Sequence, residues 1–140
     1  MKETLAFRIV ALYRDFLAYT TEELKAIGLN FGQMPLIVYT GKHPGCTQAD
    51  LRKNLNLDWG YSQRSIARLV DTGFMTKERS EESACSRLDL TDRGREAFDL
   101  CHRVFESWDH IKMKDLSAEE KKTLPALLRK IPVQRKPVHL

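Results

Sequence analysis

The sequence predicts a mainly α-helical domain that carries one small β hairpin. Apolar residues recur at three- and four-residue spacing through most of the chain, which is the period of an amphipathic helix. Helix-capping residues stand at the start of several of these segments. In contrast, residues 74–79 and 86–91 are short runs rich in strand-forming residues, and the polar stretch SEESAC separates them. A length of 140 residues indicates a single domain.

The N-terminal segment predicts one long helix and then a shorter one. Residues 1–27 place Leu5, Ile9, Leu12, Phe16 and Tyr19 on one helical face. The helix should stop at Gly28, because glycine readily adopts the left-handed conformation that ends many helices. A second helix is expected over about 31–41. Pro35 lies near its first turn, where the missing N–H costs little.

Two short helices joined by a tight turn come next. Thr47 and Asp50 have the spacing of a capping box, which predicts a helix over about 48–55. Asp58 is a good N-cap for a helix over about 59–72, and Gly73 closes it. The hairpin of residues 74–91 follows directly, so the order is helix, turn, helix, hairpin.

A long helix and a final helix complete the pattern. After the predicted cap Thr91, apolar residues recur at alternating four- and three-residue steps, a seam that usually packs against another helix; they are Ala97, Cys101, Val104, Trp108 and Ile111. Ser117 and Glu120 form a second capping box, which begins the final helix. Pro125 should kink or delay that helix. Residues 132–140 are expected to form a tail.

Composition excludes several classes of protein. No apolar run approaches the roughly 18 residues that a membrane helix needs, and charges interrupt the N-terminal apolar positions, so a cytoplasmic location is expected. The net charge of +4 comes from residues 117–140, which hold six basic and two acidic residues. The remainder of the chain is neutral overall, so an argument for a nucleic-acid partner must rest on local arrangement.

Two short helices followed by a hairpin form a winged helix-turn-helix. In this fold the second helix enters the DNA major groove with its N-terminal residues facing base edges. The stretch LNLDWGYSQR at 55–64 supplies suitable groups there. Gly60 would leave room for the sugar-phosphate wall, and Tyr61 and Ser62 could reach phosphates. Gln63 and Arg64 carry the donors that suit adenine and guanine edges.

Four further residues are candidates with an alternative role. Arg68 extends the same helix face, and its alternative is an ordinary solvated position. Trp59 could touch DNA or pack against the preceding helix. Thr47 and Gln48 begin a helix whose backbone N–H groups could meet a phosphate, although capping alone would explain them.

These motifs resemble those of the MarR family of bacterial transcription regulators. The resemblance covers about residues 29–95 and consists of the Gln33 helix before the Pro-Gly turn, TQADL at 47–51, LDWGYSQR at 57–64, Gly73-Phe-Met, and LTDRG at 90–94. It implies dimerisation helices at about 1–28 and 95–131 around a DNA-binding lobe at about 29–94. It also implies a homodimer that binds double-stranded DNA at a pseudo-palindromic operator near its own promoter.

The predicted wing departs from the family pattern. The family usually has an Asp-x-Arg motif in the hairpin loop, whose arginine enters the minor groove. Glu82 takes the acidic place here, but Ala84 takes the place of the arginine. Arg79 or Arg87 could substitute, or the wing could contribute little. The acidic pair Glu81 and Glu82 would repel phosphate if it came close.

The resemblance also implies a small aromatic or lipophilic effector, held between the dimer helices and the DNA-binding lobe. By position, Tyr13, Tyr39, Phe98 and Trp108 could line its pocket. The alternative is that these aromatic side chains belong to the core.

Cysteines and histidines suggest two weaker possibilities. Cys85 lies in the wing loop and is the better candidate for an oxidant sensor, since Cys101 lies on an apolar seam and a reactive thiol needs exposure. His102, Glu106 and His110 step by four along a helix, but both histidines cannot bind one ion from a single straight helix. We therefore predict no metal site and no cofactor.

The sequence thus predicts a dimeric, sequence-specific DNA-binding repressor that a small molecule releases. A winged-helix module that binds another protein is the alternative, as is a redox- or metal-responsive regulator. No catalytic motif stands out, so an enzyme is not expected.

Overall fold

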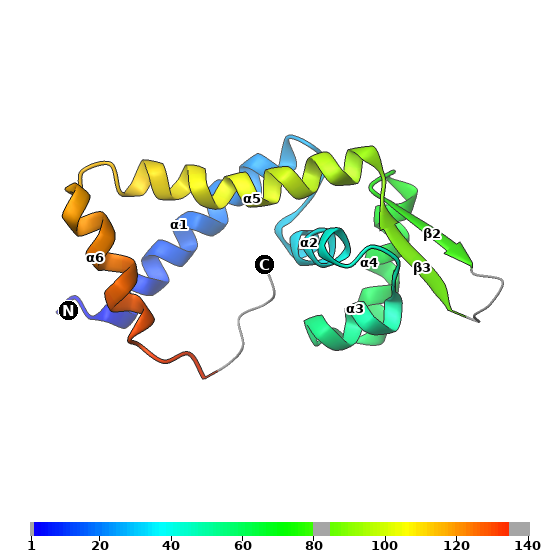
Figure 1. Cartoon of the computed structure of the whole chain (residues 1–140), viewed down its shortest axis with the longest axis horizontal. Helices are drawn as coiled ribbons and strands as arrows, with labels where there is room; N and C mark the ends of the chain where they lie inside the picture. The colour runs from blue at the N-terminus through cyan, green and yellow to red at the C-terminus, as the bar shows by residue number, and fades with distance from the viewer. Residues whose placement is uncertain (1, 80–84, 135–140) are drawn as a thin grey trace.

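The computed structural model describes residues 2–79 and 85–134, and these residues form an elongated molecule (Figure 1). In chain order they are α1 (Leu5–Lys25), the 3₁₀ turn η1 (Phe31–Gln33), α2 (Met34–Lys42), β1 (Cys46–Thr47), α3 (Gln48–Leu55), α4 (Trp59–Asp71), β2 (Met75–Arg79), β3 (Ser86–Leu90), α5 (Asp92–Lys112) and α6 (Ala118–Arg129). Helix α5 spans the length of the molecule, with α1 and α6 at one end and α2, α3, α4 and the hairpin at the other. No described helix is long and apolar enough to cross a membrane.

Short-range capping sets most element boundaries, as the sequence predicts. Thr47 and Ser117 each form a capping box, and Asp58 Oδ2 accepts a hydrogen bond from the Tyr61 N–H at 3.1 Å. Thr91 Oγ1 accepts from the Gly94 N–H at 3.0 Å and donates to the Gly73 carbonyl at 2.6 Å. These bonds satisfy backbone N–H groups that have no partner within their own helices.

Three expectations about secondary structure need correction. The helix expected over 31–41 begins as η1, because Asn30 and Gln33 form a capping box there, and α2 starts only at Met34. Strand β1 was not predicted. It pairs Cys46 with Leu88 and extends the hairpin to a three-stranded antiparallel sheet in the order β1-β3-β2. Pro125 does not delay α6, which starts at its capping box and continues through the proline.

The hydrophobic core lies under α2, where the other elements meet. Helix α2 buries Leu36, Ile37 and Val38, and α3 buries Leu51 and Leu55 as predicted. The seam of α5 is confirmed over its first part, which buries Ala97, Cys101 and Val104, whereas Ile111 is exposed. This core fixes α3, α4 and the hairpin against the first half of α5.

Candidate nucleic-acid interface

Helix α4 is the candidate recognition helix. The turn between α3 and α4 and the apolar face of α4 fix its position. Asn56 ends α3 in the left-handed conformation with φ of +53°, which asparagine tolerates better than most residues. The chain then returns through Leu57, whose N–H donates to the Arg52 carbonyl at 2.9 Å. Ile66 and Leu69 are buried and anchor α4 on the core. The opposite side of α4 therefore faces solvent.

Three predicted DNA contacts share this outward side. Gln63, Arg64 and Arg68 are all exposed, and Arg64 and Arg68 are neighbours on the helix surface at a spacing of four residues. Two guanidinium groups and one amide are thus available to a partner on the exposed side of α4. Such groups can form bidentate hydrogen bonds with guanine and adenine edges.

Ser62 is a correction to the predicted contacts. It is fully buried, and its hydroxyl donates to the Trp59 carbonyl at 2.8 Å. The reason is its helical phase, because Ser62 precedes the buried Ile66 and Leu69 by four and seven residues. It therefore faces the core and has no access to a phosphate in this structure. That spacing was already visible in the sequence.

In this structure the space beside Gly60 is occupied by a protein side chain. The sequence interpretation expected the DNA backbone to occupy that space. A Cβ atom at Gly60 would lie 3.1 Å from Arg64 Nη1 and 3.3 Å from Asp58 Oδ2. The Arg64 guanidinium therefore folds back over the first turn of α4. A glycine at this position lets that planar group lie close to the helix backbone.

Two aromatic residues at the start of α4 combine exposure with packing. Trp59 is 52% exposed, and the guanidinium carbon of Arg52 in α3 lies 5.8 Å from its ring centroid. Tyr61 is 39% exposed, and its hydroxyl would lie 3.0 Å from a Cβ atom on Gly32 of η1. Both rings thus brace α4 against its neighbours, and each keeps a solvent-facing edge.

The start of α3 is used mainly for capping. Thr47 Oγ1 accepts from the Asp50 N–H at 3.1 Å, and Asp50 Oδ2 accepts from the Thr47 N–H at 3.0 Å. The Thr47 groups lower the pKa of Asp50 by hydrogen bonding to its carboxylate. Gln48 Nε2 is buried and has no hydrogen-bond partner within the described part of the chain.

The wing presents two arginines from its strands. Arg79 ends β2 and pairs with Ser86, while Arg87 lies on β3 opposite Glu78; both arginines are exposed. The loop residues Glu81, Glu82 and Ala84, on which the departure from the family pattern rests, lie outside the described residues.

The four aromatic residues proposed for an effector pocket do not come together. Tyr39 is buried, accepts a hydrogen bond from Asn54 at 3.0 Å and stacks on His43, so it belongs to the core. Phe98 packs over Gly41. Trp108 donates to Asp15 at 2.8 Å at the far end of α5, and Tyr13 is 54% exposed on α1.

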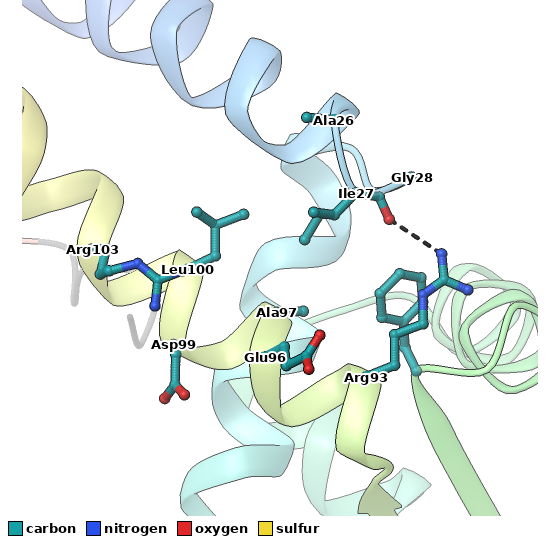
Figure 2. A pocket seen from close by; sticks show the side chains of 10 residues that line it. Ala26, Ile27, Gly28, Arg93, Glu96, Ala97, Asp99, Leu100 and Arg103 are labelled. Carbon is teal, nitrogen blue, oxygen red and sulfur yellow. Dashed lines mark hydrogen bonds between the residues drawn. The ribbon is translucent and has the colours of Figure 1, made fainter.

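Cavities lie elsewhere in the described part of the chain. One, of about 640 Å³, lies between the end of α1 and the first half of α5 (Figure 2); it is lined by Ala26, Ile27, Gly28, Phe74, Arg93, Glu96, Ala97, Asp99, Leu100 and Arg103. A smaller one of about 310 Å³ is lined by Val38, Cys101, His102, Phe105 and Glu106. None of the four predicted aromatic residues lines either cavity.

Thiol and metal chemistry find little support in the described residues. Burial raises the pKa of the Cys46 thiol to about 11 and that of Cys101 to about 12, so both stay protonated at neutral pH. Cys85 is exposed. Within residues 2–79 and 85–134, no group of three or more His, Cys, Asp or Glu side chains is placed to hold a metal ion.

Arg93 is an important residue that the sequence interpretation missed. Its Nη1 donates to the Thr72 carbonyl at 2.6 Å and its Nη2 to the Ile27 carbonyl at 3.3 Å, and the guanidinium lies over the Phe74 ring at 4.2 Å. Figure 2 shows the bond to Ile27. The only sequence signal is a basic residue after the cap Thr91, since the partners are backbone groups far apart in the chain.

Comparison with known proteins identifies relatives along almost the whole chain. No family model matches. The chain is 34% identical over 132 residues to the HTH-type transcriptional regulator BilQ of Clostridium symbiosum, covering 94% of this chain and 92% of that protein. It is 28% identical over 123 residues to the BilQ regulator of Clostridioides difficile, covering 87% of this chain and 83% of that protein.

Solved structures agree in fold. A crystal structure of MarR has 25% identity and a TM-score of 0.73, over 92% of this chain and 88% of that one. A MarR transcriptional regulator from Methanosarcina mazei Go1 has 25% identity and a TM-score of 0.71, over 93% and 88%. The predicted winged helix-turn-helix fold and the resemblance are therefore confirmed. The chain belongs to the MarR family of HTH-type transcriptional regulators, and is a DNA-binding regulator, not an enzyme.

Proposed function

We propose that this regulator acts as a homodimeric repressor, which binds a pseudo-palindromic operator and blocks a promoter. The observation that carries the proposal is that Gln63, Arg64 and Arg68 are exposed on α4, while Ile66 and Leu69 anchor the other side of this helix in the core. A mutant MarR from E.coli has been solved in complex with operator DNA, and its fold matches this chain with a TM-score of 0.69 at 24% identity over 91% of this chain and 94% of that one. The same docking is proposed here, with α4 in the major groove.

Within α4, different residues take different roles in the proposal. Arg64 and Gln63 read base edges near the start of the helix, and Arg68 contacts a phosphate or a base one turn further on. Trp59 and Tyr61 pack along the sugar-phosphate backbone with their exposed edges. Thr47 and Gln48 begin α3, and the backbone N–H groups of this helix start are proposed to meet a phosphate oxygen.

The wing contributes through its strands. Arg79 and Arg87 are exposed on β2 and β3, and either guanidinium can approach the DNA backbone next to the reading helix. Both are proposed as phosphate contacts, which position a protein on the duplex and carry no sequence information. Their contribution should therefore be independent of sequence and sensitive to salt.

The dimer is supported by apolar side chains that the single chain leaves exposed. They lie on α1, at the end of α5, and on α6 and just after it; they include Leu5, Phe7, Ile9, Val10, Leu12, Tyr13, Ile111, Leu124, Leu127, Leu128 and Ile131. Large apolar side chains that a chain leaves exposed on a few of its helices are typical of a surface that another protein covers. We therefore assign residues 1–28 and 95–131 to dimerisation and 29–94 to the DNA-binding lobe. The two α4 helices would then lie about 34 Å apart to meet adjacent half-sites.

A small molecule is proposed to release the repressor from the operator, and the 640 Å³ cavity between α1 and α5 has a suitable size. The protein would act in the cytoplasm, where it meets chromosomal DNA. The raised thiol pKa values of Cys46 and Cys101 favour this mode of control over thiolate oxidation at those two residues.

The test is selection of bound duplexes from random DNA, followed by the salt dependence of the selected site. An inverted repeat with half-site centres about one helical turn apart is expected. Affinity should fall steeply with salt, because phosphate contacts release counterions. A folded dimer that enriches no sequence would contradict the proposal.

The dimer is tested separately by Leu127→Glu. This side chain is 53% exposed, so the change should spare the fold of the chain and weaken self-association measured by sedimentation. Lys122→Glu, also on α6, is the matched control that alters charge without removing apolar surface. Equal association of both variants and the parent chain would contradict the assignment of this face.

A further inference from the structure

We propose that Arg93 is a positioning residue that ties the end of α1 to the end of α4, and so sets which half-site spacing the dimer accepts. The inference rests on the proposed dimeric operator binding, because it concerns the link between the dimerisation helices and the reading helix. Arg93 occupies the first turn of α5, where the two parts of the molecule meet (Figure 2).

Each hydrogen-bond acceptor of Arg93 is the residue directly before a glycine of positive φ. Ile27 follows Ala26, the C-cap of α1, and precedes Gly28, and Thr72 is the C-cap of α4 and precedes Gly73. Both glycines have φ of +85°. The segments that follow α1 and α4 thus turn in the same way, and both present a carbonyl group to the Arg93 guanidinium.

An arginine suits this arrangement for two reasons. Its guanidinium is a rigid planar fork, so two of its nitrogens can donate in different directions at once. The C-terminal end of a helix also carries a partial negative charge, which a cation stabilises. Arg93 serves two such ends simultaneously, and the Phe74 ring under its guanidinium fixes the plane of the fork at 4.2 Å.

The position of the link gives it leverage over DNA binding. Helix α4 is anchored on the core by Ile66 and Leu69, and α1 contributes Leu24 near its C-terminal end to the same core. The bond from Arg93 to Ile27 adds a directional polar link between the lobe and the dimerisation helix α1 beside this apolar contact. If it is lost, the lobe keeps its fold but its angle to α1 becomes less defined. The distance between the two α4 helices of the dimer then varies over a wider range.

The first experiment measures this angle without DNA. Spin labels are placed on Glu22→Cys in α1 and Ala67→Cys in α4, which are both exposed positions, in a Cys85→Ser background. The labelled chain is diluted in an excess of unlabelled chain, so that only distances within one chain are measured. The parent and the matched control Arg95→Ala, an exposed arginine on the same helix, should give one narrow distance distribution. Arg93→Ala should broaden or shift it, and Arg93→Lys, which keeps the charge but not the fork, should be intermediate.

The second experiment uses the selected operator and two versions with the half-site centres moved closer or apart by one base pair. The parent should discriminate against the altered spacings. Arg93→Ala should lose about ten-fold of that discrimination, as expected from two missing hydrogen bonds, while its binding to an isolated half-site stays unchanged. A merely structural role would weaken all duplexes equally.

The outcomes separate this inference from the proposed function. An unchanged distance distribution in Arg93→Ala, or equal weakening on every duplex, would overturn the role of Arg93. A narrow distribution in the parent and a broad one in Arg93→Ala, together with no DNA binding by the parent, would support the link and refute the operator proposal.

Discussion

Replacing Gly94 with alanine should lower the free energy of unfolding by about 2 kcal/mol, although alanine normally favours a helix. Gly94 lies in the first turn of α5, where the chain passes directly over the end of α4. An added Cβ atom would collide with the Phe74 carbonyl oxygen and would lie 3.0 Å from its carbon and 3.1 Å from the Leu90 Cβ. The obstacle is backbone, so no side-chain rotation can relieve it.

The magnitude follows from what must move. Displacing α5 would weaken the bond from the Thr91 N–H to the Phe74 carbonyl, now 3.1 Å, which is worth about 1 kcal/mol. Overpacking adds about 1–3 kcal/mol. The higher helix propensity of alanine returns roughly 1 kcal/mol at most. The net loss is then about 2 kcal/mol, or a fall in Tm of about 8 °C for a domain of this size.

Thermal and denaturant unfolding of Gly94→Ala should be compared with Gly60→Ala. At Gly60 an added Cβ atom meets Arg64 Nη1 at 3.1 Å and Asp58 Oδ2 at 3.3 Å, and both atoms are the ends of side chains that can shift, not backbone. The same substitution should therefore leave stability unchanged or raise it by up to about 1 kcal/mol. If Gly94→Ala proves as stable as Gly60→Ala, the close backbone approach over Phe74 is wrong.

Three other predictions concern binding, pH and thiol reactivity. Arg64→Ala should weaken binding to the selected operator by about 1–3 kcal/mol and relax specificity at one base pair. An equal loss on every sequence would make Arg64 a phosphate contact, and no loss would refute the assignment of α4 as the recognition helix. The pKa of Asp15 is held below its ordinary 3.8 by hydrogen bonds from a lysine and a tryptophan on α5, so its contribution to stability is complete above that pH and is lost as pH falls through the lowered pKa. Asp15→Asn should lower Tm at neutral pH, and a Tm difference that does not shrink as pH falls below 3.8 would contradict this. In the folded protein, iodoacetamide should modify Cys85 first, while Cys46 and Cys101 react only in denaturant, because burial raises their pKa to about 11 and 12; fast native alkylation of either would show that its burial is not maintained.

Local sequence was sufficient for most helix boundaries and for the central part of the candidate site. Caps such as Thr47, Asp58 and Thr91 act within three residues of themselves, so their effect is readable without knowing the fold. Gln63 and Arg64 were predicted from the order of two helices and a hairpin, and both are exposed as that order requires.

Tertiary structure decided what depends on groups distant in the chain. Strand β1 is only two residues long, too short for an alternating pattern, and exists because β3 pairs with it. The proposed effector residues Tyr39 and Trp108 were grouped by their positions in the expected fold, but Tyr39 is buried in the core and Trp108 bonds to Asp15 of α1 near the far end of α5.

The sequence by itself determined the helices, the turns and the donors on the reading helix, because helical period and capping are short-range effects. Only the folded chain decided that Arg93 bonds to Ile27 and Thr72. The acceptors of Arg93 are backbone carbonyls, which every residue carries and which no side-chain pattern can mark. They become partners only when α1, α4 and α5 meet.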